Sequence, residues 1–287
     1  LVGLAACLEG ASWLVMRFAY PTVFHFGRSS LSYDELLERQ HPVLGWPATS
    51  SFGGERYDEV GARPSPGFPD RQATPPAIAV YGDSYTYGDE VGHDDAWPEQ
   101  LARLIGARVD NFGVGGYGTD QGLVRFLTNT DADPAPVVLL CHFTCDIIRN
   151  ITRDYRHKNG VSRTAEPTFK PRFILDDDGS IRPLPLPRAE YRRYLADPAS
   201  VVPFDDLAPG QPEGELLVRR PFTLPLARGL LDPRLDTRRT WGLPSYTALY
   251  DPDHPTRALQ ITAGILERFH RAALERGRDV LAGGDAA

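Results

Sequence analysis

One serine stands where a strand-like pattern gives way to a helix-like one. Residues 77–81 form a short continuous apolar run, Ala-Ile-Ala-Val-Tyr, which predicts a buried parallel strand ended by Gly82. Ser84 follows that strand at the position where a helix would begin. Backbone N–H groups and the helix dipole at such a point stabilise a developing oxyanion, so the position favours a nucleophilic serine. Gly-Asp-Ser is also a common turn, and this structural interpretation stays open for the tripeptide alone.

A nucleophilic serine at that point must be held in place by strands and helices, and the sequence predicts such elements. Short apolar runs alternate with segments of helical apolar spacing, which is typical of a parallel sheet covered by helices on both faces. We therefore predict a doubly wound α/β fold with three layers, α/β/α, and a ligand site at the carboxyl ends of the strands. The predicted strands are residues 77–81, 107–112 and 136–143, and the predicted helices are residues 97–105, residues 121–127 and a segment entered at His254-Pro255 and stopped by Gly277.

Two segments after the first two predicted strands resemble one enzyme family. Tyr81-Gly-Asp-Ser-Tyr-Thr-Tyr-Gly88 resembles block I of the GDSL, or SGNH, hydrolases, and Asn111-Phe-Gly-Val-Gly-Gly116 resembles their second block. The resemblance implies a flavodoxin-like fold with a mostly parallel sheet and Ser84 as the nucleophile. It also implies that the N–H groups of Ser84 and Gly116 are oxyanion donors. The resemblance covers residues 77–147 well and residues 251–275 loosely.

The third block of that family is matched in part. Its usual Asn-Asp pair falls on the third and fourth residues of Phe143-Thr-Cys-Asp-Ile147, so Cys145 would stand at the position of the oxyanion-hole asparagine. A thiol is a weak donor compared with an amide N–H, and loss of one oxyanion donor costs on the order of 10²–10³ in turnover. A slower enzyme and an inactive one are both compatible with this change. A shifted alignment that brings Asn150 into the hole is the alternative.

The resemblance also implies a catalytic histidine and an aspartate that orients it. Asp251-Pro-Asp-His254 has the Asp-x-x-His spacing of the family's last block, which would make His254 the general base and Asp251 its partner. Two alternatives stay open. His254-Pro255 could cap the helix that follows, or the histidine could lie beyond Ala287, because residues 277–281 predict the start of one more buried strand.

The charge of the chain argues against nucleic acid as a partner, and the sequence patterns for a metal or a dinucleotide are weak. A net charge of −7 over 287 residues gives no electrostatic reason to bind nucleic acid, and none is predicted. Three cysteines form no disulfide framework and no zinc-ligand pattern. Residues 113–118 fit a Gly-x-Gly-x-x-Gly dinucleotide pattern, but they follow the second strand rather than the first. We predict no cofactor, and a metal held by Asp251, Asp253 and His254 lacks a second ligand cluster.

The chain is predicted to have three parts. Residues 1–20 are apolar and suggest the trailing part of a membrane anchor or signal segment whose start is missing, or else a buried amphipathic helix. Residues 21–76 are irregular, and residues 77–287 form the hydrolase-like domain, with an insertion at about 150–250 and C-terminal truncation as an open alternative. Inside the insertion, residues 173–181 predict a hairpin with an Asp-Gly turn. An anchored N-terminus would place the domain at a membrane surface, on its outer side.

These residues predict a serine hydrolase that cleaves carboxylic esters through an acyl-enzyme on Ser84. The expected partner is a small-molecule or glycan ester, and membrane association is expected only through the N-terminus. Transfer of the acyl group to a sugar hydroxyl would use the same residues, so an O-acyltransferase stays open. The alternative from another class is a binding module that keeps the scaffold and has lost catalysis.

Overall fold

The computed structural model divides the chain into two compact units, and each is described by itself. Unit 1 contains residues 1–37, 151–169 and 187–256, and unit 2 contains residues 38–150, 170–186 and 257–287. Most of the predicted insertion therefore falls in unit 1 with the N-terminal segment, whereas the three motif blocks fall in unit 2. The structure describes residues 2–21, 23–25, 33–38, 40–47, 55–129, 133–155, 168–187, 193, 204–235 and 246–284.

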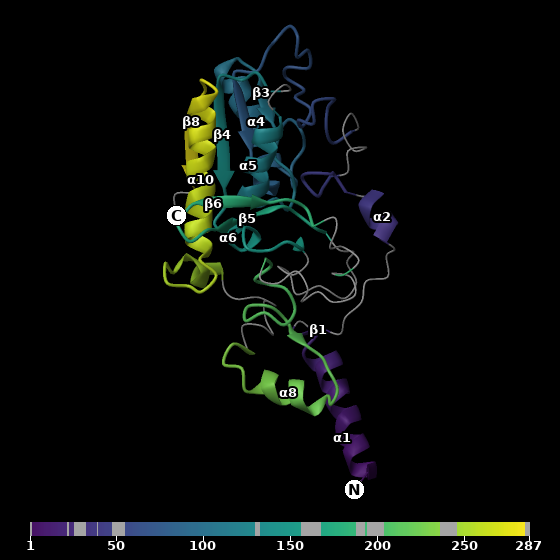
Figure 1. Ribbon diagram of the computed structural model, residues 1–287. Coiled ribbons are helices and arrows are strands. Elements are labelled where there is room, and N and C mark those ends of the chain that lie inside the picture. Colours follow the sequence, from purple (N-terminus) through teal and green to yellow (C-terminus); the bar gives the residue numbers. More distant parts are fainter. Residues whose placement is uncertain are drawn as a thin grey trace. The chain divides into compact units, whose positions relative to one another are not determined.

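Unit 2 is built on a four-stranded parallel sheet in the order β3-β2-β4-β8 (Figure 1). The register pairs Ile78 with Val109 on one side and with Val137 on the other, and Val137 with Asp279. All three predicted strands are confirmed, and the further strand expected after Gly277 is β8. The strands are β2 Ile78–Tyr81, β3 Val109–Asn111, β4 Val137–His142 and β8 Asp279–Gly284.

Helices cover both faces of this sheet and give the three-layer arrangement that the sequence predicts. Successive side chains of a strand point to opposite faces. On one face, Val80 packs with Ala102 of α4. On the other, the Tyr81 ring lies 5.5 Å from the Phe126 ring of α5, which lies 4.7 Å from the Phe269 ring of α10. The covering helices are α4 Trp97–Ile105, α5 Thr119–Thr128 and α10 Ala258–Glu275 (Figure 1).

Helix α10 begins three residues later than the sequence predicts. Pro255 is expected in its first turn, but the helix begins at Ala258, after an Arg257 whose φ of 54° is left-handed. Because the backbone of Arg257 is not helical, the helix does not extend back to Pro255. The predicted end is confirmed, because the helix ends at Glu275 and Gly277 has a φ of 68°, a conformation that favours glycine.

The predicted hairpin is confirmed and packs on α10. Strand β5, Arg172–Leu175, pairs antiparallel with β6, Ile181–Leu184, and Gly179 in the turn has a φ of 81°. A Cβ atom at Gly264 would approach the Ile181 Cγ2 atom to 2.6 Å, so the hairpin lies very close to the helix. The hairpin therefore belongs to unit 2, although it lies inside the predicted insertion.

The described part of the segment just before β2, residues 55–77, contains no helix and no extended strand. Earlier in the segment predicted to be irregular, residues 21–76, the structure has the short elements β1, Phe24–His25, and α2, Tyr33–Glu38. The side chains of residues 55–77 still contribute to unit 2, because Tyr57 and Ala62 are buried and Arg63 forms a single β-bridge with Asn111. Two short helices follow strands of the sheet: α3, Ser84–Tyr87, after β2, and α6, Asp146–Arg149, after β4.

Unit 1 begins with an apolar helix, α1 Val2–Leu14, which continues as the π-type helix η1, Val15–Ala19. Together the two span 18 residues with a mean hydropathy of 1.3, enough by length and composition to cross a membrane. Only 11% of this span is buried. A buried amphipathic helix, the alternative from the sequence, does not fit that exposure.

The remaining elements of unit 1 are short. Strand β1, Phe24–His25, pairs parallel with β7, Leu216–Leu217. A small core of Met16, Val23 and Phe24 holds this pair against the end of the N-terminal helix. The other elements are α2 Tyr33–Glu38, α8 Thr223–Leu230 and the 3₁₀ helix η5 Tyr246–Tyr250.

Candidate active site

Ser84 is the first residue of α3, directly after the turn that leaves β2. The Asp83 carboxylate caps this helix by accepting a hydrogen bond from the Tyr85 N–H at 2.9 Å. The helix ends after one turn at Gly88, whose φ is 81°. Ser84 is half-buried, and neither its hydroxyl nor its N–H has a hydrogen-bond partner among the described residues. Both groups are therefore open to a ligand.

Asn111, the last residue of β3, fixes the glycine loop to α3. Its amide nitrogen donates to the carbonyl oxygens of Thr86 and Tyr87 at 2.9 and 3.2 Å, and its amide oxygen accepts from the Gly113 N–H at 2.9 Å. A Cβ atom at Gly113 would lie 2.4 Å from the Tyr87 nitrogen. Glycine is needed at position 113 because backbone meets backbone there, which gives a structural reason for the first glycine of the Gly-x-Gly-x-x-Gly pattern.

Gly116 lies in the same loop with a φ of 82°, in the left-handed region that favours glycine. It is half-buried, and its N–H has no hydrogen-bond partner among the described residues. The loop is held on its other side by Trp46, whose indole N–H donates to the Gly115 carbonyl at 2.9 Å. The Gly116 N–H is therefore a fixed donor rather than a mobile one.

Cys145 lies in the turn between β4 and α6, and it is half-buried. The turn is closed by two bonds between Phe143 and Asp146, since the Asp146 N–H donates to the Phe143 carbonyl at 2.7 Å and the Asp146 carboxylate accepts from the Phe143 N–H at 3.2 Å. The Phe143 ring stacks on the ring of Tyr85, with centroids 4.2 Å apart. This contact brings the start of α3 next to the Cys145 turn.

A single buried arginine, Arg149, joins all three motif segments. Its Nη1 atom lies 2.9 Å from an Asp83 carboxylate oxygen and 2.5 Å from an Asp146 carboxylate oxygen, and it donates to the Tyr117 carbonyl at 2.7 Å. The three charged side chains are at most 6% exposed. The guanidinium therefore ties the serine turn, the glycine loop and the Cys145 turn to one point.

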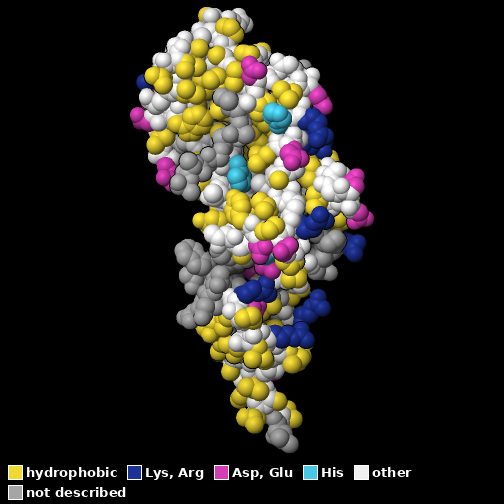
Figure 2. Space-filling model, turned by 90° about the vertical axis from the view of Figure 1, so that its left-hand side faces the viewer, with side chains coloured by type: hydrophobic (Ala, Val, Ile, Leu, Met, Phe, Trp, Pro, Cys, Tyr) yellow, Lys and Arg dark blue, Asp and Glu magenta, His cyan; other side chains and the backbone are white. Residues whose placement is uncertain are grey.

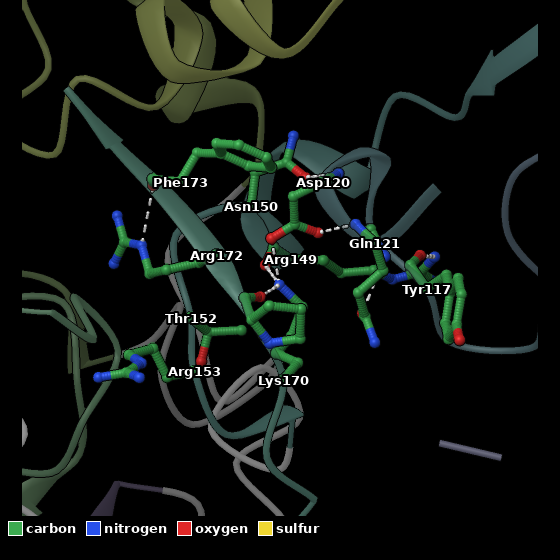
Figure 3. A network of polar contacts seen from close by, with 12 residues as sticks. Tyr117, Asp120, Gln121, Arg149, Asn150, Thr152, Arg153, Lys170, Arg172 and Phe173 are labelled. Carbon is green, nitrogen blue, oxygen red and sulfur yellow. Dashed lines mark hydrogen bonds and ion pairs between the residues drawn. The ribbon is translucent and has the colours of Figure 1, made fainter. Parts of the chain in front are cut away.

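A second buried ion pair lies behind Arg149. Lys170 donates to the Asp120 carboxylate, and both side chains are fully buried. Burial raises the pKa of the Asp120 carboxyl, and the Lys170 ammonium opposes that shift. Lys170 also donates to the Arg149 carbonyl at 3.0 Å, so the two ion pairs are linked (Figure 3).

Asn150, the alternative oxyanion donor from the shifted alignment, is fully buried in this same region. Its amide oxygen accepts from the Asp120 N–H at 3.2 Å, and its amide nitrogen donates to the Thr262 hydroxyl at 2.9 Å. The amide is thus used inside the core, which leaves Cys145 as the residue at the edge of the sheet.

The two remaining predicted residues, Asp251 and His254, lie in unit 1. The Nδ1 atom of His254 lies 2.8 Å from the Thr256 hydroxyl, whereas the Asp251 carboxylate accepts from the Asp253 N–H at 2.9 Å. The structure thus brings Ser84, Gly116 and Cys145 to one edge of the sheet in unit 2. The roles of His254 as base and of Asp251 as its partner remain predictions.

Other ligand sites suggested by the sequence gain no support from the described residues. No group of three or more His, Cys, Asp or Glu side chains in that part of the chain could hold a metal ion. His142, at the end of β4, is bonded through Nδ1 to the Thr119 hydroxyl at 2.7 Å. All three cysteines lack a disulfide.

Comparison with known proteins gives a partial likeness. No family model matches the chain, and no curated protein matches it. Similar solved structures include AlinE4, described as an SGNH-hydrolase family esterase, and two of its single-residue mutants. They are 24–25% identical, have a TM-score of 0.23, and are matched over 30% of this chain and 50% of theirs. The chain thus spans about half the length of these esterases, and such a likeness does not assign it to a family.

The close approach of the glycine loop to α3 predicts that Gly113→Ala lowers the free energy of unfolding by about 1–3 kcal/mol, as overpacking does. Urea unfolding followed by circular dichroism measures the loss. Gly92→Ala is the matched control, because its added Cβ would lie 3.5 Å from an Asp95 oxygen, an ordinary contact. If Gly113→Ala were as stable as the control Gly92→Ala, the loop would tolerate a methyl group at position 113, contrary to the prediction.

The position of Arg149 predicts that Arg149→Met destabilises unit 2 strongly, because two buried carboxylates lose their counter-charge. Breaking a buried ion pair in this way costs about 3–5 kcal/mol. The exposed Arg271, which makes no ion pair among the described residues, provides the control Arg271→Met, for which we expect a change within about 0.5 kcal/mol. Urea midpoints that do not separate the two variants would contradict the role of Arg149.

Proposed function

We propose that this protein is a serine hydrolase that cleaves carboxylic esters, with Ser84 as its nucleophile. The observation that carries the proposal is the meeting of two open groups at one sheet edge. The Ser84 hydroxyl and the Gly116 N–H both lack partners among the described residues, and both lie in segments tied to Arg149. A serine oxygen and a backbone donor that follow neighbouring strands of one sheet are the kinds of group that acyl transfer requires.

In the proposed reaction, the Ser84 oxygen attacks the ester carbonyl while a histidine removes its proton. The tetrahedral oxyanion is stabilised by the N–H groups of Ser84 and Gly116 and by the Cys145 thiol. The alcohol leaves with the proton returned by the histidine, and water then attacks the acyl-enzyme to release the acid and regenerate the serine. The base in this proposal is His254, oriented by Asp251, and the alternative is a histidine outside the 287 residues.

The substrate we favour is an ester of a polar alcohol, such as a glycan ester. A cavity of about 650 Å³ lies beside the glycine loop, with Gly115 in its wall. It is lined by the rings of Trp46 and Tyr57 and by an Arg56–Asp89 ion pair of 2.5 Å. Aromatic residues beside charged groups suit a hydroxylated group better than an acyl chain. A sugar hydroxyl bound there would also serve as acceptor in an O-acyltransferase.

A binding module on the same scaffold is the second candidate, and Cys145 is the observation in its favour. A thiol donates a weaker hydrogen bond than the amide that the resemblance implies at this position. We further propose that α1 attaches unit 1 to a membrane, because Val2–Ala19 is long, apolar and mostly exposed.

Labelling with a fluorophosphonate tests the nucleophile. We expect one adduct by mass spectrometry, located on Ser84, because only an activated serine displaces the fluoride at a useful rate. The Ser84→Ala variant should give none. Folded wild-type protein without an adduct would exclude an activated serine in this chain and favour the binding module.

Replacement of the candidate base is a separate test. His254→Ala and Asp251→Asn should lower the labelling rate if these residues activate Ser84, by about 10²-fold or more for the histidine. His270→Ala is the control, since His270 is an exposed histidine on α10. Labelling that persists unchanged in His254→Ala would assign the base to another histidine and leave Ser84 as the nucleophile.

Restoring an amide at the third motif should raise turnover. We expect Cys145→Asn to increase kcat for a p-nitrophenyl ester by about 10- to 100-fold, because an oxyanion donor is worth 10²–10³ in favourable geometry. Cys145→Ala, which has no donor, should not exceed the wild type. Equal rates for the asparagine and alanine variants would mean that residue 145 does not face the oxyanion.

A further inference from the structure

A second cavity, in unit 1, has the chemistry of a site for an anionic amphiphile. Its volume is about 380 Å³, and it lies between β7 and α8. One part of the wall is cationic and contains Arg219, Arg220 and Arg228, while the other part is apolar and contains Leu217, Leu224 and Pro225. None of the described residues that line this cavity is acidic.

The three arginines lie at the surface, and one of them, Arg220, is close enough to Glu9 to add to the stronger hydrogen-bond effects that lower the pKa of its carboxyl. All three are exposed, and none makes an ion pair among the described residues. Arg220 lies with its guanidinium carbon 5.7 Å from the centre of the Phe222 ring, which keeps it beside the cavity. Three exposed guanidinium groups thus line one cavity in a chain with a net charge of −7. Their mutual repulsion is relieved when an anion binds between them.

The cavity lies next to the candidate membrane helix. Glu9 of α1 accepts hydrogen bonds from the N–H groups of Phe222 and Thr223, at 2.5 and 3.1 Å, and from the Thr223 hydroxyl at 2.7 Å. These bonds fix the start of α8 to the middle of α1. Helix α8, which carries Arg228, and the residues just before it, which include Arg219 and Arg220, are therefore attached to the middle of α1.

Exposed apolar side chains surround this junction. Val2 and Leu4 of α1 are 86% and 73% exposed, and Leu231, which follows α8, is 82% exposed. In the lower part of Figure 2, which contains α1, hydrophobic side chains lie next to Lys or Arg side chains. Residues 2–8 of α1 lie beyond the Glu9 contact, so this part of the helix can enter a bilayer while the arginines near Glu9 stay at its surface, the usual pattern of interfacial lipid contact.

We propose that this cavity binds the phosphate headgroup of an anionic phospholipid in the membrane that α1 enters. The guanidinium groups donate to the phosphate oxygens in the paired geometry that arginine favours, and the leucines and Pro225 contact the glycerol and upper acyl chain. A soluble phosphate ester offers the same oxygens, but the link between Glu9 and α8 places the arginines beside a membrane helix. The lipid headgroup is therefore the source of the phosphate.

Vesicle flotation of the full chain tests this site, with vesicles of phosphatidylcholine alone and of phosphatidylcholine and phosphatidylglycerol at about 3:1. We expect binding to both through α1 and tighter binding to the anionic vesicles. Replacing Arg219, Arg220 and Arg228 together by Gln should weaken binding to the anionic vesicles by about tenfold or more, since each arginine near the surface contributes to the attraction. Binding to phosphatidylcholine should not change.

The matched control replaces Arg193, Arg257 and Arg271 by Gln, which removes the same charge from exposed positions outside the cavity. Circular dichroism checks that both triple variants are folded. Equal weakening in the two triple variants would overturn the proposal, because net charge would then explain the binding. A cavity variant that still prefers anionic vesicles overturns it as well. Protection of the cavity by inorganic phosphate in a thermal shift assay, with no preference for anionic vesicles, would assign the site to a soluble phosphate instead.

Discussion

The geometry of the candidate site depends on one buried guanidinium. Arg149 is 6% exposed and contacts carboxylates from the serine turn and from the Cys145 turn, together with a carbonyl of the glycine loop. Removing these charges from water costs several kcal/mol for each ion, and their attraction roughly repays it. The net gain in stability is therefore small. The effect on the positions of the three loops is large, because all of them bond to the same guanidinium. A shift of the serine turn or of the Cys145 turn would leave a buried charge without its partner.

Hydrogen bonds to the backbone and close backbone contacts also hold the glycine loop in place. Asn111 fills the space between β3 and α3 with two donated bonds and one accepted bond, all within 3.2 Å. Gly113 lets the loop backbone approach the Tyr87 nitrogen, and the left-handed Gly116 turns the chain back. These constraints act on the backbone, so the Gly116 N–H is held in place without a side chain that could occlude it. A donor fixed in this way loses little free energy to reorganisation during a reaction.

The sequence predicts the strands and helices of this arrangement, which depend on neighbouring residues. It does not predict the contacts between residues that are far apart in the chain. Periodicity is a local property, so it locates the strands of the sheet and gives α4 at Trp97–Ile105, as observed. The late start of α10 depends on the left-handed Arg257, which no pattern signals. No sequence pattern indicates the roles of Arg149 and Lys170, because their carboxylate partners at Asp83 and Asp120 are 66 and 50 residues away. The weak signal for Arg149 is Asp146, three residues earlier, which shares a helix face with it. Ser84, Gly116 and Cys145 could be proposed because each directly follows a strand or its loop at the same sheet edge.

The contrast between the satisfied interior and the open edge favours a reaction site over a purely structural one. Behind the sheet edge, Lys170, Asp120 and Asn150 use their polar atoms on one another and on the backbone, as buried polar groups must. At the edge, the Ser84 hydroxyl, the Ser84 N–H and the Gly116 N–H have no partner among the described residues. Because these groups are only half-buried, water can bond to them, and the penalty for an unsatisfied buried group does not arise. Keeping three such groups open and half-buried, on loops fixed by buried charges, is useful when a ligand oxygen is to take the place of water there.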